Sequence, residues 1–265
     1  VAGDARGELL FISDADILVE PDTLQLMARW FVDPEVGAVQ ADHLRYRQDG
    51  SPAEGVFDRW ESLVRRLEGR LGVMVGPNGW GMMMRRSLYE AIPDNTINDD
   101  LELGIRMLKR GCHFLFEPKA IVRSGVEAEK VEFGRRVRFG RGNMQALAWN
   151  LDIFRPGTLT AAWALLSHKF LRTLLPFTLV WMPVGAALVL PHPAAVVFLG
   201  LLAVVLITTP FAQRVRGAFR KLMLPQYFVL MNAAQLYGGL RHILGFREPY
   251  WRRTPRAGDC NEGVR

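Results

Sequence analysis

Two long apolar runs constrain what this chain can fold into more than any other feature. Residues 171–190 read LRTLLPFTLVWMPVGAALVL, with one charged residue near the start, and residues 194–212 read AAVVFLGLLAVVLITTPFA, with none. A helix of about 20 apolar residues crosses the hydrocarbon core of a bilayer. The alternative is a buried helical hairpin, which is costly to cover in a chain of 265 residues. Because only Pro191, His192 and Pro193 separate the runs, we expect a transmembrane hairpin.

Basic residues gather on both sides of these runs. The formal net charge is +6 and the pI is about 9.7. The flanking cations are Arg135, Arg136, Arg138, Arg141, Lys169 and Arg172 before the runs and Arg214, Arg216, Arg220 and Lys221 after them. Since Lys and Arg mark the cytoplasmic side of membrane spans, we expect a multi-pass protein of the inner or plasma membrane whose globular first half and C-terminal tail are cytosolic.

The charge does not indicate nucleic acid. No RNA-binding or DNA-binding pattern accompanies it, so anionic lipid and phosphate are the expected partners. Cys112 and Cys260 show no metal-like spacing. We therefore expect free thiols in a reducing compartment.

The first 150 residues alternate strand-like and helix-like segments. Strands are predicted at 8–12, 36–40, 82–84 and 113–117, and helices at 21–31, 57–71, 86–91 and from 99 to a C-cap at Gly111. The helix at 57–71 carries an apolar stripe with arginines opposite, which we interpret as an ordinary core face: Phe57, Trp60, Leu63, Val64, Leu67 and Leu71.

An apolar strand at the start of the chain leads into two carboxylates, Asp14 and Asp16. Two acids on alternate residues of a turn can share one divalent cation, and hard oxygen ligands suit Mg²⁺ or Mn²⁺. Such an ion completes its coordination with water and substrate phosphates. For Asp14-Ala15-Asp16 taken alone, a solvated turn is the alternative to a metal site.

Three further segments have functional patterns. Gly76–Gly81 is a glycine-rich turn that allows a ligand to approach the backbone closely. Asp99 and Asp100 lie at the start of a predicted helix. The alternative to a functional role for these acids is capping of that helix. The segment 131–147 carries clustered arginines, and guanidinium groups bind phosphates in bidentate geometry. A juxtamembrane charge patch is the alternative for that cluster.

In this order the motifs resemble the family 2 membrane glycosyltransferases, which include cellulose, hyaluronan and chitin synthases and ceramide glucosyltransferase. The family pattern is a metal-binding Asp-x-Asp, a glycine-containing acceptor turn, an acidic pair with the catalytic base, and Gln/Arg-x-x-Arg-Trp beside membrane helices. The matching segments are Asp14-Ala15-Asp16, Gly76–Gly81, Asp99-Asp100 and Arg135-Arg136-Val137-Arg138-Phe139. The resemblance covers nearly the whole chain.

The resemblance implies an α/β fold: a partial glycosyltransferase A-type (nucleotide-diphospho-sugar transferase) domain followed by a transmembrane helical hairpin and interfacial helices. The family has a first β/α half that binds uracil, and this stretch lacks it. The chain also begins at Val1 without an initiator Met. We therefore expect an N-terminally truncated sequence that is inactive by itself.

The resemblance also implies roles for individual residues. Asp16 and Asp14 would hold the metal, and Asp100, beside Asp99, would be the general base. The remaining implied sites are Arg138 and Arg135 for the donor diphosphate, Phe139, Gly79 and Trp80 for the acceptor, and Trp251, Thr254 and Arg256 for a gating loop. A plain basic tail is the alternative for the gating loop.

Two positions depart from the pattern of the polymerising synthases. Phe139 replaces Trp, which keeps an aromatic surface for a sugar but removes the indole N–H donor. Arg135 replaces Gln and is similar to the glycolipid-forming branch. Processive synthesis and single transfer therefore both stay open.

Together these patterns predict residues 1–150 as the C-terminal part of a catalytic domain and 151–265 as a membrane region. The membrane region would hold an interfacial helix at 159–172, spans at 171–190 and 194–212, an interfacial helix or third span at 222–244, and a basic cytosolic tail at 245–265. His168 is expected to be a polar residue at the interface.

The expected function is inverting, metal-dependent transfer of a sugar from a nucleotide-diphospho-sugar, with a UDP-sugar preferred, to a growing polysaccharide at the cytoplasmic membrane. The alternatives are a non-processive, glycolipid-forming transferase and a catalytically dead membrane scaffold. The expected partners are a nucleotide-sugar donor, a polysaccharide or lipid acceptor and the bilayer, and no nucleic acid.

Overall fold

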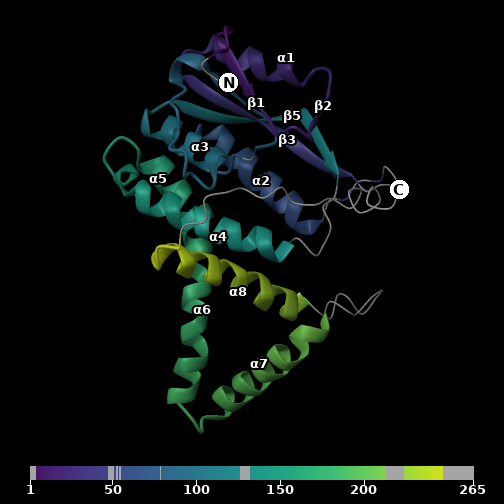
Figure 1. The fold of residues 1–265 in the computed structure, drawn as a ribbon, viewed down its shortest axis with the longest axis vertical. Coiled ribbons are helices and arrows are strands. Elements are labelled where there is room, and N and C mark those ends of the chain that lie inside the picture. The colour runs from purple at the N-terminus through teal and green to yellow at the C-terminus, as the bar shows by residue number, and fades with distance from the viewer. Residues whose placement is uncertain are drawn as a thin grey trace. The chain divides into compact units, whose positions relative to one another are not determined.

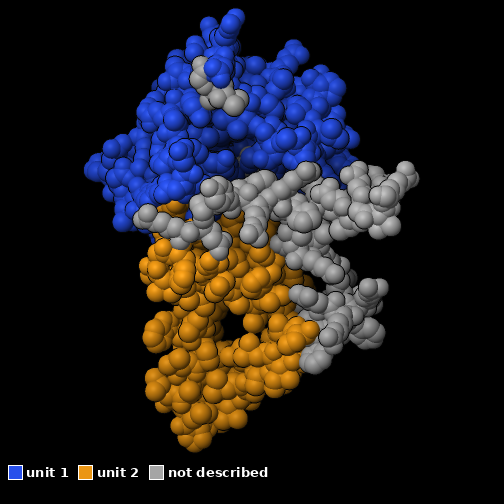
Figure 2. Space-filling model, viewed as in Figure 1, with its two compact units in different colours: residues 1–128, 146–169, 252–265 blue, residues 129–145, 170–251 orange. Residues whose placement is uncertain are grey.

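The computed structural model describes residues 4–46, 51, 53, 55–77, 79–125, 132–212 and 224–246. The chain divides into two compact units, shown in different colours in Figure 2. Of the described residues, those up to 125 and 146–169 belong to unit 1, and 132–145 and 170–246 belong to unit 2. The division into domains at residue 150 remains a prediction.

Unit 1 is built on a five-stranded sheet in the order β1-β4-β3-β5-β2. Figure 1 labels four of these strands, β1, β2, β3 and β5. The strands are β1 (Leu9–Ile12), β2 (Leu18–Val19), β3 (Val36–Tyr46), β4 (Met82–Arg85) and β5 (His113–Gly125). Strand β4 is antiparallel to both β1 and β3, and β3 is parallel to β5. Strands β1, β3 and β5 therefore run in one direction, and their carboxyl ends share an edge with the start of β4.

Helices cover both faces of this sheet. On one face α1 (Thr23–Ala28), continued by the 3₁₀ helix η2 (Arg29–Val32), places Met27 in a cluster with Val39 and Met83. On the other face lie α2 (Val56–Arg70) and α3 (Asp99–Lys109), whose Gly69 and Gly104 contact Phe116 and Phe114. The α/β fold predicted from the alternating segments is confirmed.

Most predicted elements occur, with different ends. Strands β3 and β5 are longer than predicted because they pair with each other from Asp42 and Ile121 onward, beyond the reach of β4. Helix α3 is followed by Gly111 with φ +74°, as a glycine C-cap requires. The helix predicted at 86–91 is only a 3₁₀ turn, η3 (Arg86–Leu88).

Helix α2 corrects one prediction. Its apolar stripe is not a core face, because four large apolar side chains of the helix and its C-cap are 48–66% exposed: Trp60, Leu63, Leu67 and Leu71. The helix instead buries charged side chains, and Glu61, Arg65 and Glu68 are only 8–9% exposed. The sequence periodicity located the stripe correctly, but not the side of the helix that faces the protein.

Unit 2 is helical. It contains the first part of α4 (Glu132–Trp149), followed later in the chain by α6 (Leu171–Leu188), α7 (Pro193–Ala212) and α8 (Leu224–Ile243). Helices α4 and α8 approach at glycines, since a Cβ at Gly140 or at Gly238 would overlap the backbone of the other helix at Gln235 or Val137. Gln226 Nε2 donates to Thr208 Oγ1 at 2.9 Å and joins α8 to α7.

Two helical stretches are long and apolar enough to cross a membrane, Leu159–Leu188 and Pro193–Pro210. The first joins α5 (Leu159–Leu165), the π-helical segment η6 (Leu166–Phe170) and α6. Only 11% and 6% of their most apolar windows are buried. Length and composition are thus consistent with the predicted hairpin, and the placement of α8 in or across a membrane remains a prediction.

Candidate functional site

The sheet brings the Asp-x-Asp turn to the glycine-rich turn. Ile12 at the end of β1 pairs with Met82 at the start of β4, so antiparallel pairing places the residues after β1 beside those before β4. The Asp14 N–H donates to the Gly79 carbonyl oxygen at 2.6 Å. A Cβ at Gly79 would lie 3.0 Å from Asp14 Oδ1, so the missing side chain leaves room for the carboxylate. Two of the predicted motifs therefore meet.

The acidic pair lies at the start of α3. Asn98 occupies the N-cap, so neither Asp99 nor Asp100 is the capping residue. Asp99 Oδ1 accepts the Asp100 N–H at 3.0 Å, and Asp100 Oδ1 accepts the Leu101 N–H at 2.7 Å. The capping alternative is thus wrong for both acids in its usual form, in which an N-cap side chain accepts an N–H two or three residues further on.

Asp100 has an unusual acidity. Burial raises the pKa of Asp100 to about 6, the negative charges of Asp99 and Asp14 act in the same direction, and the Leu101 N–H and the charge of Lys169 oppose them. Asp14 is therefore near enough for its charge to act on Asp100. A carboxylate with this pKa is suited to accept a proton near neutral pH.

Lys169 is a member of this site that the sequence analysis counted only as a flanking cation. A Cβ at Gly76 would lie 3.3 Å from Lys169 Nζ, so the lysine side chain passes over the glycine-rich turn. Its positive charge acts on Asp100. The only sequence signal was a His168-Lys169 pair within an otherwise apolar helical segment.

Trp80 contacts groups from two other elements, β3 and α2. The His43 ring stacks on it with centroids 3.7 Å apart, and the Arg65 guanidinium carbon lies 5.9 Å from its ring centroid. His43 Nε2 lies 2.8 Å from Ser124 Oγ. Burial, with the charges of Arg45 and Arg65, lowers the pKa of His43 to about 3, so its ring is neutral. The sequence analysis missed His43, and its use of Trp80 for an acceptor remains a prediction.

His168 is buried between two glutamates, which corrects its expected place at the membrane interface. Its Nδ1 lies 2.7 Å from Glu68 Oε1 and its Nε2 lies 3.1 Å from Glu61 Oε1. Ionised carboxylates only accept hydrogen bonds, so a ring that bonds two of them donates from both nitrogens and is an imidazolium. Arg65 lies 3.7 Å from Glu61 and completes the cluster. These contacts fix η6 on α2, and thereby position the neighbouring Lys169.

The predicted arginine site lies on the part of α4 that belongs to unit 2. There the guanidinium carbons of Arg135 and Arg138 lie 5.7 and 5.4 Å from the ring centroid of Phe139. Their binding of a diphosphate, and the contact of Phe139 with an acceptor, remain predictions. The gating-loop residues Trp251, Thr254 and Arg256 lie outside the described residues.

The donor set fits a divalent cation. Asp14 and Asp16 offer carboxylate oxygens from one turn, and Gly79 leaves space beside Asp14. Elsewhere in the described part of the chain, Asp33, Glu35 and His113 bring potential ligand atoms within 4.8 Å of one another. Asp33 and Glu35 are exposed and His113 is half-buried. The three residues precede or start β3 and β5, at the sheet edge opposite Asp14, and are separate from the candidate site.

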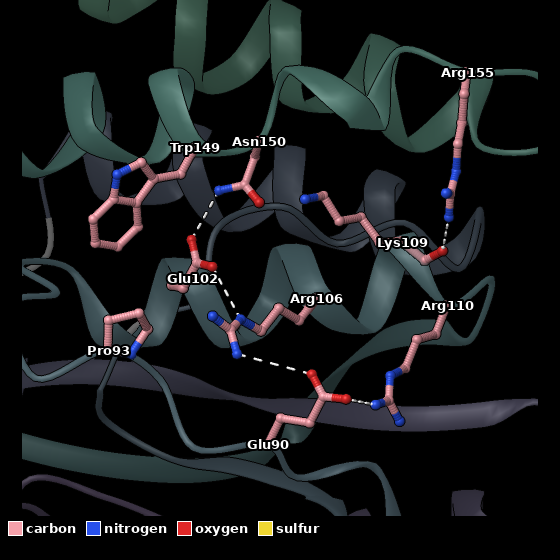
Figure 3. Close-up of a pocket in the computed structure, with 9 residues that line it drawn as sticks. All are labelled: Glu90, Pro93, Glu102, Arg106, Lys109, Arg110, Trp149, Asn150 and Arg155. Atoms are coloured by element: carbon pink, nitrogen blue, oxygen red, sulfur yellow. Dashed lines mark hydrogen bonds and ion pairs between the residues drawn. The ribbon is translucent and has the colours of Figure 1, made fainter.

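A surface pocket of about 530 Å³ lies on the far side of α3 (Figure 3). Its charged side chains are already engaged: Glu102 lies between Asn150 at 2.8 Å and Arg106 at 3.0 Å, and Glu90 binds Arg106 and Arg110. This network fastens the segment after α4 to α3, the helix that presents Asp100. The residues around the pocket therefore stabilise the helix that carries Asp100.

Residues 9–209 match the family described as Glycosyl transferase family group 2. Over 184 residues the chain is 27% identical to a beta-monoglucosyldiacylglycerol synthase of Trichormus variabilis, covering 64% of this chain and 38% of that protein. Over 116 residues it is 28% identical to a protein of the same name from Synechocystis sp., covering 40% and 24% respectively. The chain thus spans less than two fifths of the length of these curated relatives.

A solved structure has the same fold. It is the mannosyltransferase PcManGT from Pyrobaculum calidifontis in complex with GDP-Man and Mn²⁺, with a TM-score of 0.59, 18% sequence identity, and coverage of 91% of this chain and 64% of that chain. The predicted nucleotide-diphospho-sugar transferase type of α/β fold is confirmed.

Proposed function

Because the chain belongs to glycosyl transferase family group 2, we propose that it forms the base and metal part of an active site that transfers a sugar from a nucleotide-diphospho-sugar to a lipid acceptor at a membrane. The observation that carries this proposal is the grouping of Asp14 and Lys169 on the glycine-rich turn with Asp100, whose pKa burial raises to about 6. The curated relatives are named as glycolipid synthases, and Arg135 is the residue that we associate with that branch. Both favour single transfer over the polysaccharide synthesis that the sequence first predicted.

The chemistry follows from the side chains. Asp100 removes the proton of the acceptor hydroxyl while that oxygen attacks the anomeric carbon of the sugar, and the bond to the nucleoside diphosphate breaks. Attack from the side opposite the leaving group inverts the anomeric configuration. Lys169 holds positive charge beside the glycine-rich turn, where it stabilises the ionised form of Asp100.

The leaving group carries negative charge that must be offset. Asp14 and Asp16 would hold Mg²⁺ or Mn²⁺, which when bound neutralises charge developing on the diphosphate. The family resemblance assigns Arg138 and Arg135, on α4, to diphosphate binding, for which guanidinium groups are suited. The structural neighbour was solved with GDP-Man and Mn²⁺, which supports a divalent cation and adds GDP-sugars to the UDP-sugars as candidate donors.

The proposal is tested with the full-length protein in membranes. Release of nucleoside diphosphate is measured from a panel of UDP-sugars and GDP-mannose, with diacylglycerol as acceptor, with Mg²⁺, Mn²⁺ or a chelator. We expect turnover of one donor that stops on chelation, and a lipid product that carries one sugar. Long products would establish polysaccharide synthesis instead. No turnover by a folded protein with any donor would favour the inactive scaffold.

The pH profile of this reaction should depend on the neighbours of Asp100. Since the base works only when ionised, kcat/KM is expected to fall about tenfold per pH unit once the pH is below the pKa of Asp100, which is about 6 without a bound cation. Asp99→Asn removes a like charge, so this acidic limb should move to lower pH, whereas Lys169→Met removes a favourable charge and should move it to higher pH. Asp94→Asn, an exposed acid near the same helix, serves as the control. If the pH profiles of Asp99→Asn and Lys169→Met both superimposed on that of the wild type, the assignment of Asp100 as base would be contradicted.

A further inference from the structure

Helix α2 exposes large apolar side chains and buries charged ones. A surface helix normally turns its apolar stripe to the core and its charges to water. Here Trp60, Leu63 and Leu67 are 58%, 48% and 51% exposed, while Glu61 and Glu68 are both 8% exposed. The buried acids are satisfied by His168, so the orientation of the helix is fixed by specific bonds.

The exposed charge on this helix has one sign. At about 100° per residue, Leu63, Leu67 and Leu71 lie within about 60° of Trp60, and a row of arginines lies about 80–120° to one side. The row consists of Arg59, Arg66 and Arg70, all exposed. Asp58, the remaining acid of α2, is paired with Arg45. The outer face is therefore apolar along its centre and cationic along one edge.

We propose that this face of α2 lies on the anionic surface of the membrane, with Trp60, Leu63, Leu67 and Leu71 in the boundary between headgroups and acyl chains. Trp and Leu beside arginines form the pattern of helices that lie in this plane, and each cation near an anionic leaflet adds to binding. The same chain carries two helical stretches long and apolar enough to cross a bilayer, which would tether unit 1 to the surface that α2 contacts. Tethering makes that contact intramolecular and favours the bilayer over a soluble partner.

This contact has a consequence for the reaction. Helix α2 carries Glu61 and Glu68, which hold His168 and thereby position Lys169 over the glycine-rich turn. A bilayer seated on the outer face would thus be connected through one helix to the residues beside Asp100. The inference rests on the proposed function only for this consequence, since the contact itself follows from the surface of α2.

The test places an environment-sensitive fluorophore on the full-length protein in vesicles of phosphatidylcholine with phosphatidylglycerol. Native cysteines are replaced by serine, and single cysteines are introduced as Leu63→Cys, Leu67→Cys and, as the matched control, Leu24→Cys on α1, where the leucine is 45% exposed. At 63 and 67 we expect blue-shifted emission that doxyl-labelled lipid quenches more than aqueous iodide does. At position 24 aqueous iodide should quench the emission more than doxyl-labelled lipid does.

Charge is tested separately by Arg59→Gln/Arg70→Gln, which leaves Arg66 with its Asp42 partner at 3.5 Å. This double variant, or vesicles of phosphatidylcholine alone, should increase quenching by iodide at 63 and 67, whereas Arg6→Gln/Lys119→Gln, which removes two exposed cations elsewhere in unit 1, should not. Iodide access at 63 and 67 equal to that at 24 would overturn the proposal. Protection from both quenchers would also overturn it, because protein rather than lipid would then cover the face.

Discussion

Asp100→Asn is expected to lower the turnover number by about 10²- to 10⁴-fold, the range that a positioned general base contributes. The amide has nearly the same shape, and its oxygen can still accept the Leu101 N–H that Asp100 Oδ1 accepts at 2.7 Å. Local structure is therefore expected to persist. What is lost is the carboxylate that takes the proton of the acceptor hydroxyl. The measurement is single-turnover transfer by the full-length protein in membranes, together with binding of a fluorescent nucleotide.

Donor binding distinguishes this loss from a structural one. Asp100→Asn should leave nucleotide affinity nearly unchanged, whereas Asp16→Asn should weaken it and remove its dependence on the divalent cation. Asp94→Asn, exposed near the same helix, should match the wild type in both assays. Equal losses of nucleotide affinity in Asp100→Asn and Asp16→Asn would contradict the division of roles between base and metal ligand.

The parts of the site that could be predicted are those encoded locally. An apolar strand followed by Asp14 and Asp16, and a helix that begins after Asn98 and is followed by Gly111, each follow from residues adjacent in the chain. The order of these motifs then gave the fold family, which the match over residues 9–209 confirms. Adjacent residues determine strand ends and helix caps, so these features needed no knowledge of the packing.

The parts that could not be predicted depend on residues far apart in the sequence. The periodicity of α2 marks two faces, but its polar face is buried because His168, a hundred residues from Glu68, lies against it. The same holds for much of the acidity of Asp100, whose pKa is raised first by burial and then by the adjacent Asp99, with further contributions from the distant Lys169 and Asp14. His43 gave no motif at all, and its stacking on Trp80 follows from the strand pairing of β3. Each is a tertiary effect.

His168→Leu is expected to destabilise unit 1 by about 3–5 kcal/mol, the cost of breaking a buried charge pair by removing one partner. The imidazolium bonds Glu68 Oε1 at 2.7 Å and Glu61 Oε1 at 3.1 Å, and all three side chains are at most 10% exposed. Leucine fills much of the same space but leaves the two carboxylates without their shared cation. At about 2–4 °C per kcal/mol the midpoint of thermal unfolding should fall on the order of 10 °C in the detergent-solubilised full-length protein.

The same substitution at an exposed histidine is the control. His192→Leu changes a residue in the exposed turn between α6 and α7 and should leave the unfolding midpoint nearly unchanged. Adding Glu68→Gln to His168→Leu should recover part of the loss, because an uncharged glutamine at position 68 no longer requires the imidazolium while Glu61 keeps Arg65 as its partner. A fall of equal size in His192→Leu, or no recovery in the double variant, would contradict the ion-pair explanation. If the ion-pair explanation holds, His168→Leu also removes the contacts that position Lys169. The acidic limb of the pH profile should then move to higher pH, as in Lys169→Met.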